Sequence, residues 1–167
     1  MGNFETAPLD EAQISARSRD FARQLFTRFP DFRRHAEMER LLGAELWELA
    51  VTVPAASGKA EVFLFVWVED GATGEPSVSL VRWHTHASVW QAEDKGSLLE
   101  LIEGILADRY VICAQVGVPS YVPPRLLDLA EEDALMEFMT RPHTAESAIV
   151  YSWSGRLDRT LTLRDFE

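Results

Sequence analysis

The sequence predicts an α+β domain: an antiparallel-rich sheet of about five to seven strands, with an N-terminal amphipathic helix and one or two further helices packed on it. Three observations support this class. Apolar residues recur at helical spacing in some segments, they alternate with polar residues in others, and turns rich in glycine and proline separate the strands. A length of 167 residues, 47% of them apolar, fits a single domain over residues 1–167 with a core of its own.

The N-terminal part is predicted to be helical. Residues 1–9 show no apolar period and are expected to form a loose tail. A helix is predicted over residues 10–28, with Asp10 as its N-cap and Pro30 beyond its end. A second short helix is expected over residues 31–42. The apolar stripe of the first helix consists of Ile14, Phe21, Leu25 and Phe29.

The sheet is predicted from period-two segments joined by short turns. The segment 47–53 alternates, which is typical of a strand with one solvated face, whereas 61–69 is apolar on both faces and is expected at the sheet centre. Helices are predicted over 94–107 and 131–140, and a closing hairpin turns at Ser154 and Gly155. The predicted strands cover residues 47–53, 61–69, 76–86, 110–116, 125–129, 148–153 and 159–163.

Charge and composition exclude several functions. The net charge is −11, and the whole acidic excess lies in residues 41–140, which argues against nucleic-acid binding and favours a basic protein partner. The longest apolar run, Val62 to Val68, is too short to span a bilayer, so no membrane association and a cytoplasmic location are expected. The single cysteine, Cys113, lies in an apolar run and is expected to be an inert buried thiol.

The most distinctive motif is Trp83-His84-Thr85-His86. On a strand the two histidines point to the same face, so they can hold a metal ion together. A complete zinc site needs a third ligand, which would have to come from His35, His143 or a carboxylate. The favoured interpretation is that these histidines belong to a binding surface at a sheet edge.

A second candidate segment runs from Tyr151 to Asp158. Arg156 and Asp158 are close enough in sequence to form a surface ion pair with each other, or Asp158 with Arg159, within a turn. Three tryptophans, Trp83, Trp90 and Trp153, lie beside polar motif residues, and tryptophan is frequent at binding hot spots. The predicted binding residues are therefore Trp83, His84, His86, Trp90, Trp153, Arg156 and Asp158.

The order of these segments resembles that of a group of small, largely uncharacterised bacterial proteins with a W-H-T-H signature. That group looks like the immunity-type proteins of polymorphic toxin systems, which bind and block toxins in the cytoplasm. Ala87 departs from the pattern, in which an aromatic residue follows the signature. The matching stretches are 45–53, Val53-Pro54 with Ser57-Gly58, 62–71, 83–86, 100–109 and 152–156.

The leading hypothesis is a non-catalytic, cytoplasmic, immunity-like protein that binds a basic protein partner through an acidic, tryptophan-rich surface and needs no cofactor. No G-x-S-x-G, G-x-x-x-x-G-K-[ST] or G-x-G-x-x-G sequence is present, which argues against the corresponding enzyme classes. Two alternatives stay open. One is a metal-binding protein or metal-dependent hydrolase that uses His84 and His86 with a divalent metal. The other is a small-molecule-binding homo-oligomer with a tryptophan-lined pocket.

Overall fold

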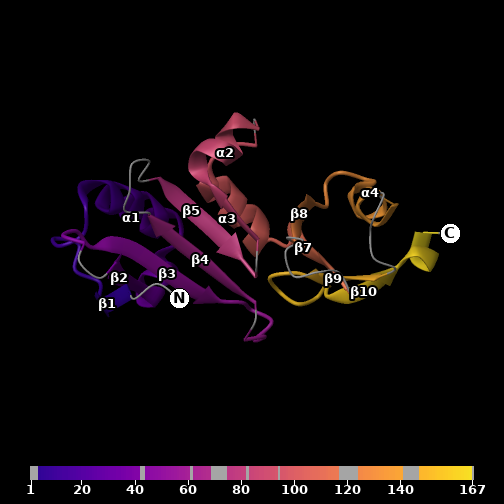
Figure 1. Cartoon of the computed structure of the whole chain (residues 1–167), viewed down its shortest axis with the longest axis horizontal. Coiled ribbons are helices and arrows are strands. Elements are labelled where there is room, and N and C mark those ends of the chain that lie inside the picture. Colours follow the sequence, from indigo (N-terminus) through magenta and orange to yellow (C-terminus); the bar gives the residue numbers. More distant parts are fainter. Residues whose placement is uncertain are drawn as a thin grey trace. The chain divides into compact units, whose positions relative to one another are not determined.

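The fold is α+β with antiparallel sheets, which confirms the predicted class (Figure 1). In the described residues ten strands form two sheets, where the sequence predicted one: six strands in the order β1-β2-β3-β4-β5-β6 and four in the order β10-β9-β7-β8. The computed structural model describes residues 4–41, 44–60, 62–68, 75–81, 83–93, 95–116, 124–140 and 147–166.

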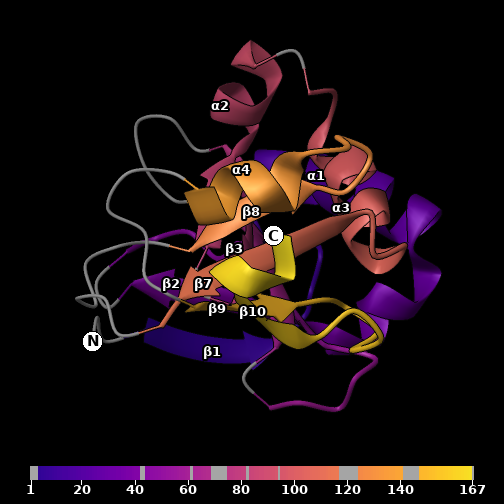
Figure 2. The same ribbon diagram turned by 90° about the vertical axis from the view of Figure 1, so that its right-hand side faces the viewer.

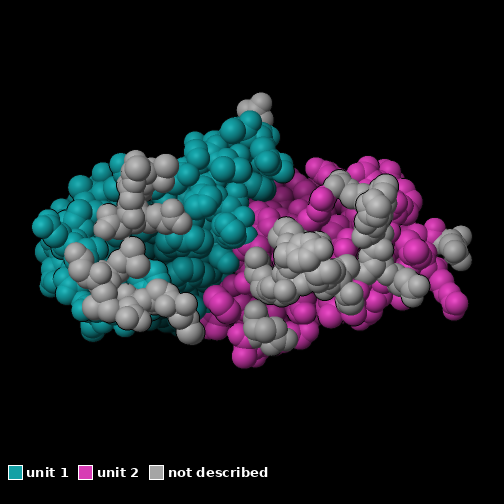
Figure 3. Space-filling view, viewed as in Figure 1, with its two compact units in different colours: residues 1–53, 64–79, 84–100 teal, residues 54–63, 80–83, 101–167 magenta. Residues whose placement is uncertain are grey.

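The chain divides into two compact units (Figure 3). Unit 1 comprises residues 1–53, 64–79 and 84–100, and unit 2 comprises residues 54–63, 80–83 and 101–167. A single domain over residues 1–167 therefore stays a prediction.

The described strands are β1 (Phe4–Pro8), β2 (Ala36–Leu41), β3 (Glu48–Pro54), β4 (Phe63–Val68), β5 (Pro76–Leu80), β6 (Trp83–His86), β7 (Tyr110–Gln115), β8 (Arg125–Asp128), β9 (Ser147–Tyr151) and β10 (Arg159–Thr162). The described helices are α1 (Ala16–Arg28), α2 (Ala87–Ala92), α3 (Leu98–Leu106) and α4 (Ala134–Thr140), with 3-10 helices η1 (Pro30–His35) and η2 (Leu163–Phe166). None of these helices combines the length and hydrophobicity that a bilayer-spanning segment needs.

The predicted loose tail over residues 1–9 is wrong for its described part. Residues 4–8 form β1, which pairs antiparallel with β2, so that Thr6 lies opposite Glu39. An ion pair of 2.5 Å between Glu5 and Arg40 also joins the two strands. Sequence periodicity could not reveal this strand, because its partner lies about thirty residues away.

The predicted helix boundaries also need correction. Helix α1 begins at Ala16, and Ser15 is its N-cap, accepting a hydrogen bond of 3.1 Å from the Ser18 backbone N–H. Asp10 instead accepts hydrogen bonds from Ala12 N–H and the Gln13 side chain, which closes a local turn without a helix. The helix predicted over 31–42 is replaced by η1 and then by β2, which pairs with strands on both sides.

The central strand is correctly predicted, but its neighbours differ in detail. Strand β4 lies between β3 and β5. The strand predicted over 76–86 is two strands, β5 and β6, because the chain turns at Val81, whose φ is 57°. On β3 the expected solvated face is mostly covered, and Glu48 is only 8% exposed.

Unit 2 has its own hydrophobic core. Helix α4 lies over the four-stranded sheet (Figure 2), and its buried Phe138 and Met139 belong to one hydrophobic cluster with Val111 and Val150 of that sheet. The predicted hairpin is confirmed, since β9 and β10 pair antiparallel. Cys113 lies in this core, as expected, and burial raises the pKa of its thiol to about 12.

Candidate functional site

The two histidines of β6 lie on the edge strand of the six-stranded sheet. His84 is exposed and His86 is half-buried, while Thr85 between them is buried on the opposite face. The two imidazole ring centres are 5.8 Å apart, and the ring planes are nearly perpendicular. The strand geometry therefore brings the pair together as the sequence predicts.

Two hydroxyl contacts surround this pair. The buried Ser77 hydroxyl of β5 lies 2.7 Å from Nδ1 of His86. Glu75 accepts hydrogen bonds of 2.9 Å from both the Ser88 hydroxyl and the Ser88 backbone N–H, just beyond His86. These bonds lower the pKa of the Glu75 carboxyl, and the nearby His86 lowers it further.

The third ligand that a complete metal site would need is not found in the part of the chain that the structure describes. No group of three or more His, Cys, Asp or Glu side chains there converges on one point. His35 accepts a hydrogen bond of 3.0 Å from Nε of Arg34. His143 lies outside the described residues, so its predicted contribution stays untested.

The tryptophans do not form the exposed surface that the sequence predicted. Trp90 is 4% exposed and Trp153 is 7% exposed, and only Trp83 of the three is half-buried. Trp90 lies on α2, a short helix that begins directly after β6 and that the sequence did not predict. The fold therefore uses Trp90 and Trp153 for packing.

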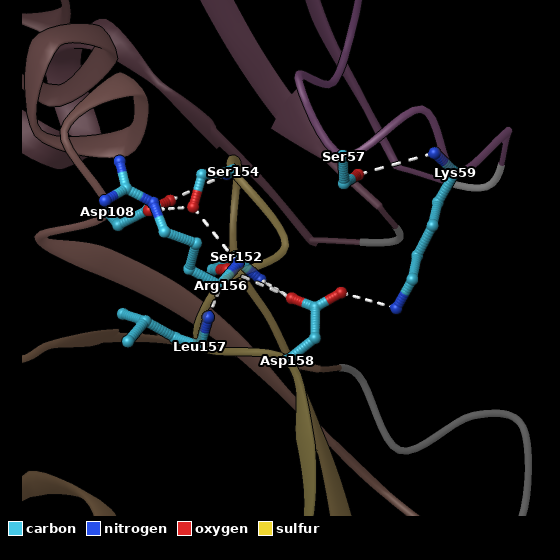
Figure 4. Close-up of polar contacts among 8 residues, drawn as sticks. All are labelled: Ser57, Lys59, Asp108, Ser152, Ser154, Arg156, Leu157 and Asp158. Atoms are coloured by element: carbon cyan, nitrogen blue, oxygen red, sulfur yellow. Dashed lines mark hydrogen bonds and ion pairs between the residues drawn. The ribbon is translucent and has the colours of Figure 1, made fainter.

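The segment from Ser152 to Asp158 forms a tight, internally bonded turn (Figure 4). Asp158 accepts hydrogen bonds from the Ser152 backbone N–H at 2.6 Å and from the Ser152 hydroxyl at 3.0 Å. Its second carboxylate oxygen lies 2.5 Å from Nζ of Lys59. The ion pair of Asp158, expected with Arg156 or Arg159, is instead formed with Lys59, which is distant in sequence.

Sequence reasoning also missed a second carboxylate that holds this turn. Asp108 accepts hydrogen bonds from the backbone N–H and the hydroxyl of Ser154 (Figure 4). Its φ of 56° is left-handed, which an aspartate tolerates better than most residues, so the sequence signal for this turn is an aspartate directly after the helix predicted over 94–107. Gly155, with a φ of 77°, makes the sharp bend of the turn. The polar side chains of this loop therefore stabilise the fold and are not available as a binding site.

An exposed acidic segment precedes and enters α4. Asp133 and Glu137 are one helical turn apart, and Met136 on the same helix is 39% exposed. None of the carboxylates of Glu132, Asp133 and Glu137 forms an ion pair with a described residue. No basic residue occurs between positions 126 and 140. We call this surface, made of Glu132, Asp133, Met136 and Glu137, the α4 acidic face.

Comparisons with family models, curated proteins and solved structures found no match to this chain. The resemblance to immunity-type proteins therefore stays a prediction from sequence segments.

Proposed function

We propose that this chain is a non-catalytic binding protein of the immunity type, which binds a basic protein partner through acidic surface. The observation that carries the proposal is the α4 acidic face, whose carboxylates are exposed and lie in a stretch, residues 126–140, that contains no basic residue. The acidic excess of the chain, which lies wholly in residues 41–140, supports the same kind of partner.

The physical argument concerns unbalanced charge. Asp133 and Glu137 lie one turn apart at the start of α4, so their mutual repulsion of about 0.2–0.5 kcal/mol is opposed by the attraction of each carboxylate to the helix N-terminus. A lysine- or arginine-rich partner relieves this repulsion on binding, and its attraction to the acidic segment raises the association rate. The exposed Met136 offers a flexible apolar contact at the centre of this face.

Trp90 and Trp153 are buried, so these two tryptophans cannot provide a contact surface for a partner. Recognition of the partner therefore depends on complementary charge and not on a tryptophan-rich contact surface. A binding surface of this kind depends strongly on ionic strength, because exposed charges are screened by salt.

The test is to co-express the chain with the protein encoded by the neighbouring gene and to measure association kinetics of the purified pair. We expect a complex whose association rate falls steeply between about 50 mM and about 500 mM salt. The double variant Asp133→Lys, Glu137→Lys should slow association by about tenfold or more.

The matched control is Asp20→Lys, Asp31→Lys, which reverses two exposed acids in the electrically neutral N-terminal part of the chain. This variant should keep the association rate within about twofold of the unmodified protein. An association that ignores salt, or that both double variants slow equally, would contradict the proposal.

A further inference from the structure

We propose that His84 and His86 form a two-histidine chelating site for a divalent transition-metal ion of the zinc, nickel or copper type, at the open edge of the six-stranded sheet. Imidazole nitrogen is a preferred ligand for these metals. The site is independent of the α4 acidic face and uses none of its residues.

The separation of the two rings fits chelation of one ion. A metal–nitrogen bond of about 2.0–2.1 Å places the ion about 3 Å from each ring centre, so a tetrahedral angle needs ring centres about 5 Å apart. The observed separation is 5.8 Å, and a small side-chain rotation closes the difference. His84 is exposed, so its ring is free to make that rotation.

The buried Ser77 hydroxyl supplies an orienting contact of the kind that metal-bound histidines use. Histidine ligands generally donate their second ring N–H to a neighbouring acceptor, which fixes the tautomer and the ring position. At 2.7 Å, Ser77 Oγ can accept the proton on Nδ1 of His86. That arrangement leaves the lone pair of His86 Nε2 for the metal ion.

The surroundings favour a cation and leave it accessible. The Glu75 carboxylate is held by hydrogen bonds from Ser88, two residues beyond His86, and so brings negative charge to the neighbourhood of the pair. Among the described strands β6 is the last of its sheet, and His84 on it is exposed. Within the described ranges no third protein donor converges on the pair, so water or an external ligand completes the coordination sphere.

The test is calorimetric titration of the full chain, freed of metal by chelator, with Ni²⁺ or Zn²⁺ alone at about pH 7.5, above the ordinary imidazole pKa. We expect saturable binding of one ion per chain. Replacing either ligand, by His84→Ala or His86→Ala, should weaken binding by at least about tenfold. His84 is exposed, so the first variant should keep the native circular dichroism spectrum.

Two further variants separate chelation from general affinity. His35→Ala removes a histidine outside the pair and should leave binding unchanged. Ser77→Ala should keep the stoichiometry but weaken binding by about 10- to 100-fold, as expected for loss of an orienting contact. Absence of saturable binding, or binding that survives His84→Ala, His86→Ala together, would overturn the proposal.

Discussion

Replacement of Asp158 by alanine should destabilise the protein strongly, although Asp158 lies in a surface turn. Its side chain is 9% exposed and accepts two hydrogen bonds from Ser152, which is itself fully buried. Hydrogen bonds to a charged group contribute about 1.5–3 kcal/mol, and a buried N–H left without a partner costs about 1–3 kcal/mol. We therefore expect Asp158→Ala to lower the free energy of unfolding by about 2–5 kcal/mol.

Two milder variants separate the contributions. Asp158→Asn keeps one acceptor oxygen for Ser152 and removes the charge, so its cost should be about 1–2 kcal/mol. Lys59→Met removes only the ion pair with Asp158, and because Lys59 is 44% exposed that pair should contribute no more than about 1 kcal/mol. The free energies come from urea unfolding followed by circular dichroism, with the slope m compared among variants.

The pH dependence gives a second check on Asp158. Burial opposes ionisation of this carboxyl, but hydrogen bonds from Lys59 and Ser152 outweigh burial, and the pKa of Asp158 lies below its ordinary value. The stabilisation is therefore complete above about pH 4 and is lost as the pH falls through the folded-state pKa. The stability difference between the unmodified protein and Asp158→Asn should shrink in that acid range. A loss below about 0.5 kcal/mol for Asp158→Ala, or a loss equal to that of Lys59→Met, would refute this reasoning.

Three further outcomes follow from the described geometry. Cys113 should resist thiol reagents in the native protein at about pH 8 and react on unfolding, because its pKa is raised to about 12 by burial; rapid native labelling would contradict this. Ser15→Ala should cost about 1–2 kcal/mol in urea unfolding, whereas Asp10→Ala should stay within about 0.5 kcal/mol, and the reverse order would restore the N-cap predicted from sequence. Gly155→Ala should lower the melting temperature more than Gly58→Ala. Both glycines have positive φ, but of the two only Gly155 has a neighbour, Ser57 Cβ, within 2.8 Å of an added Cβ. Equal losses of melting temperature would show that this contact is unimportant.

The sequence predicted well those strands whose own residues are apolar throughout or alternate between apolar and polar. Strand β4 is apolar at every position and lies inside the sheet, and β7 and the β9–β10 hairpin follow the same logic. Strand β2, with the sequence AEMERL, was predicted as helix because alanine, glutamate, methionine, arginine and leucine all favour helices. Pairing with β1 and β3 overrides that preference.

The parts of the candidate site that the sequence missed depend on contacts between distant segments. Asp158 finds Lys59 across 99 positions, which no local pattern reports. Val81 has a left-handed φ, which is rare for a β-branched residue. Because the sequence has no glycine at this turn, it predicts one strand over 76–86 where the structure has two. The pairing of His84 with His86 was predictable because strand geometry alone places them on one face.

The described carboxylates differ in what they bind, and this difference bears on where a partner can attach. Glu48, Asp108 and Asp158 each accept two or more hydrogen bonds from serine hydroxyls or backbone N–H groups that hold the fold. A partner cannot use these groups without breaking bonds that the fold requires, so their replacement should lower stability whatever it does to binding. Asp133 directly precedes α4 and Glu137 lies in its first turn, where the helix N-terminus favours acids. Asp133→Asn, Glu137→Gln removes both charges but keeps a capping side chain at position 133, so stability should change by less than about 1 kcal/mol. If this double variant loses partner binding while its stability is nearly unchanged, the α4 acidic face takes part in recognition. Replacing Glu48, Asp108 or Asp158 could not show this, because it would also destabilise the fold.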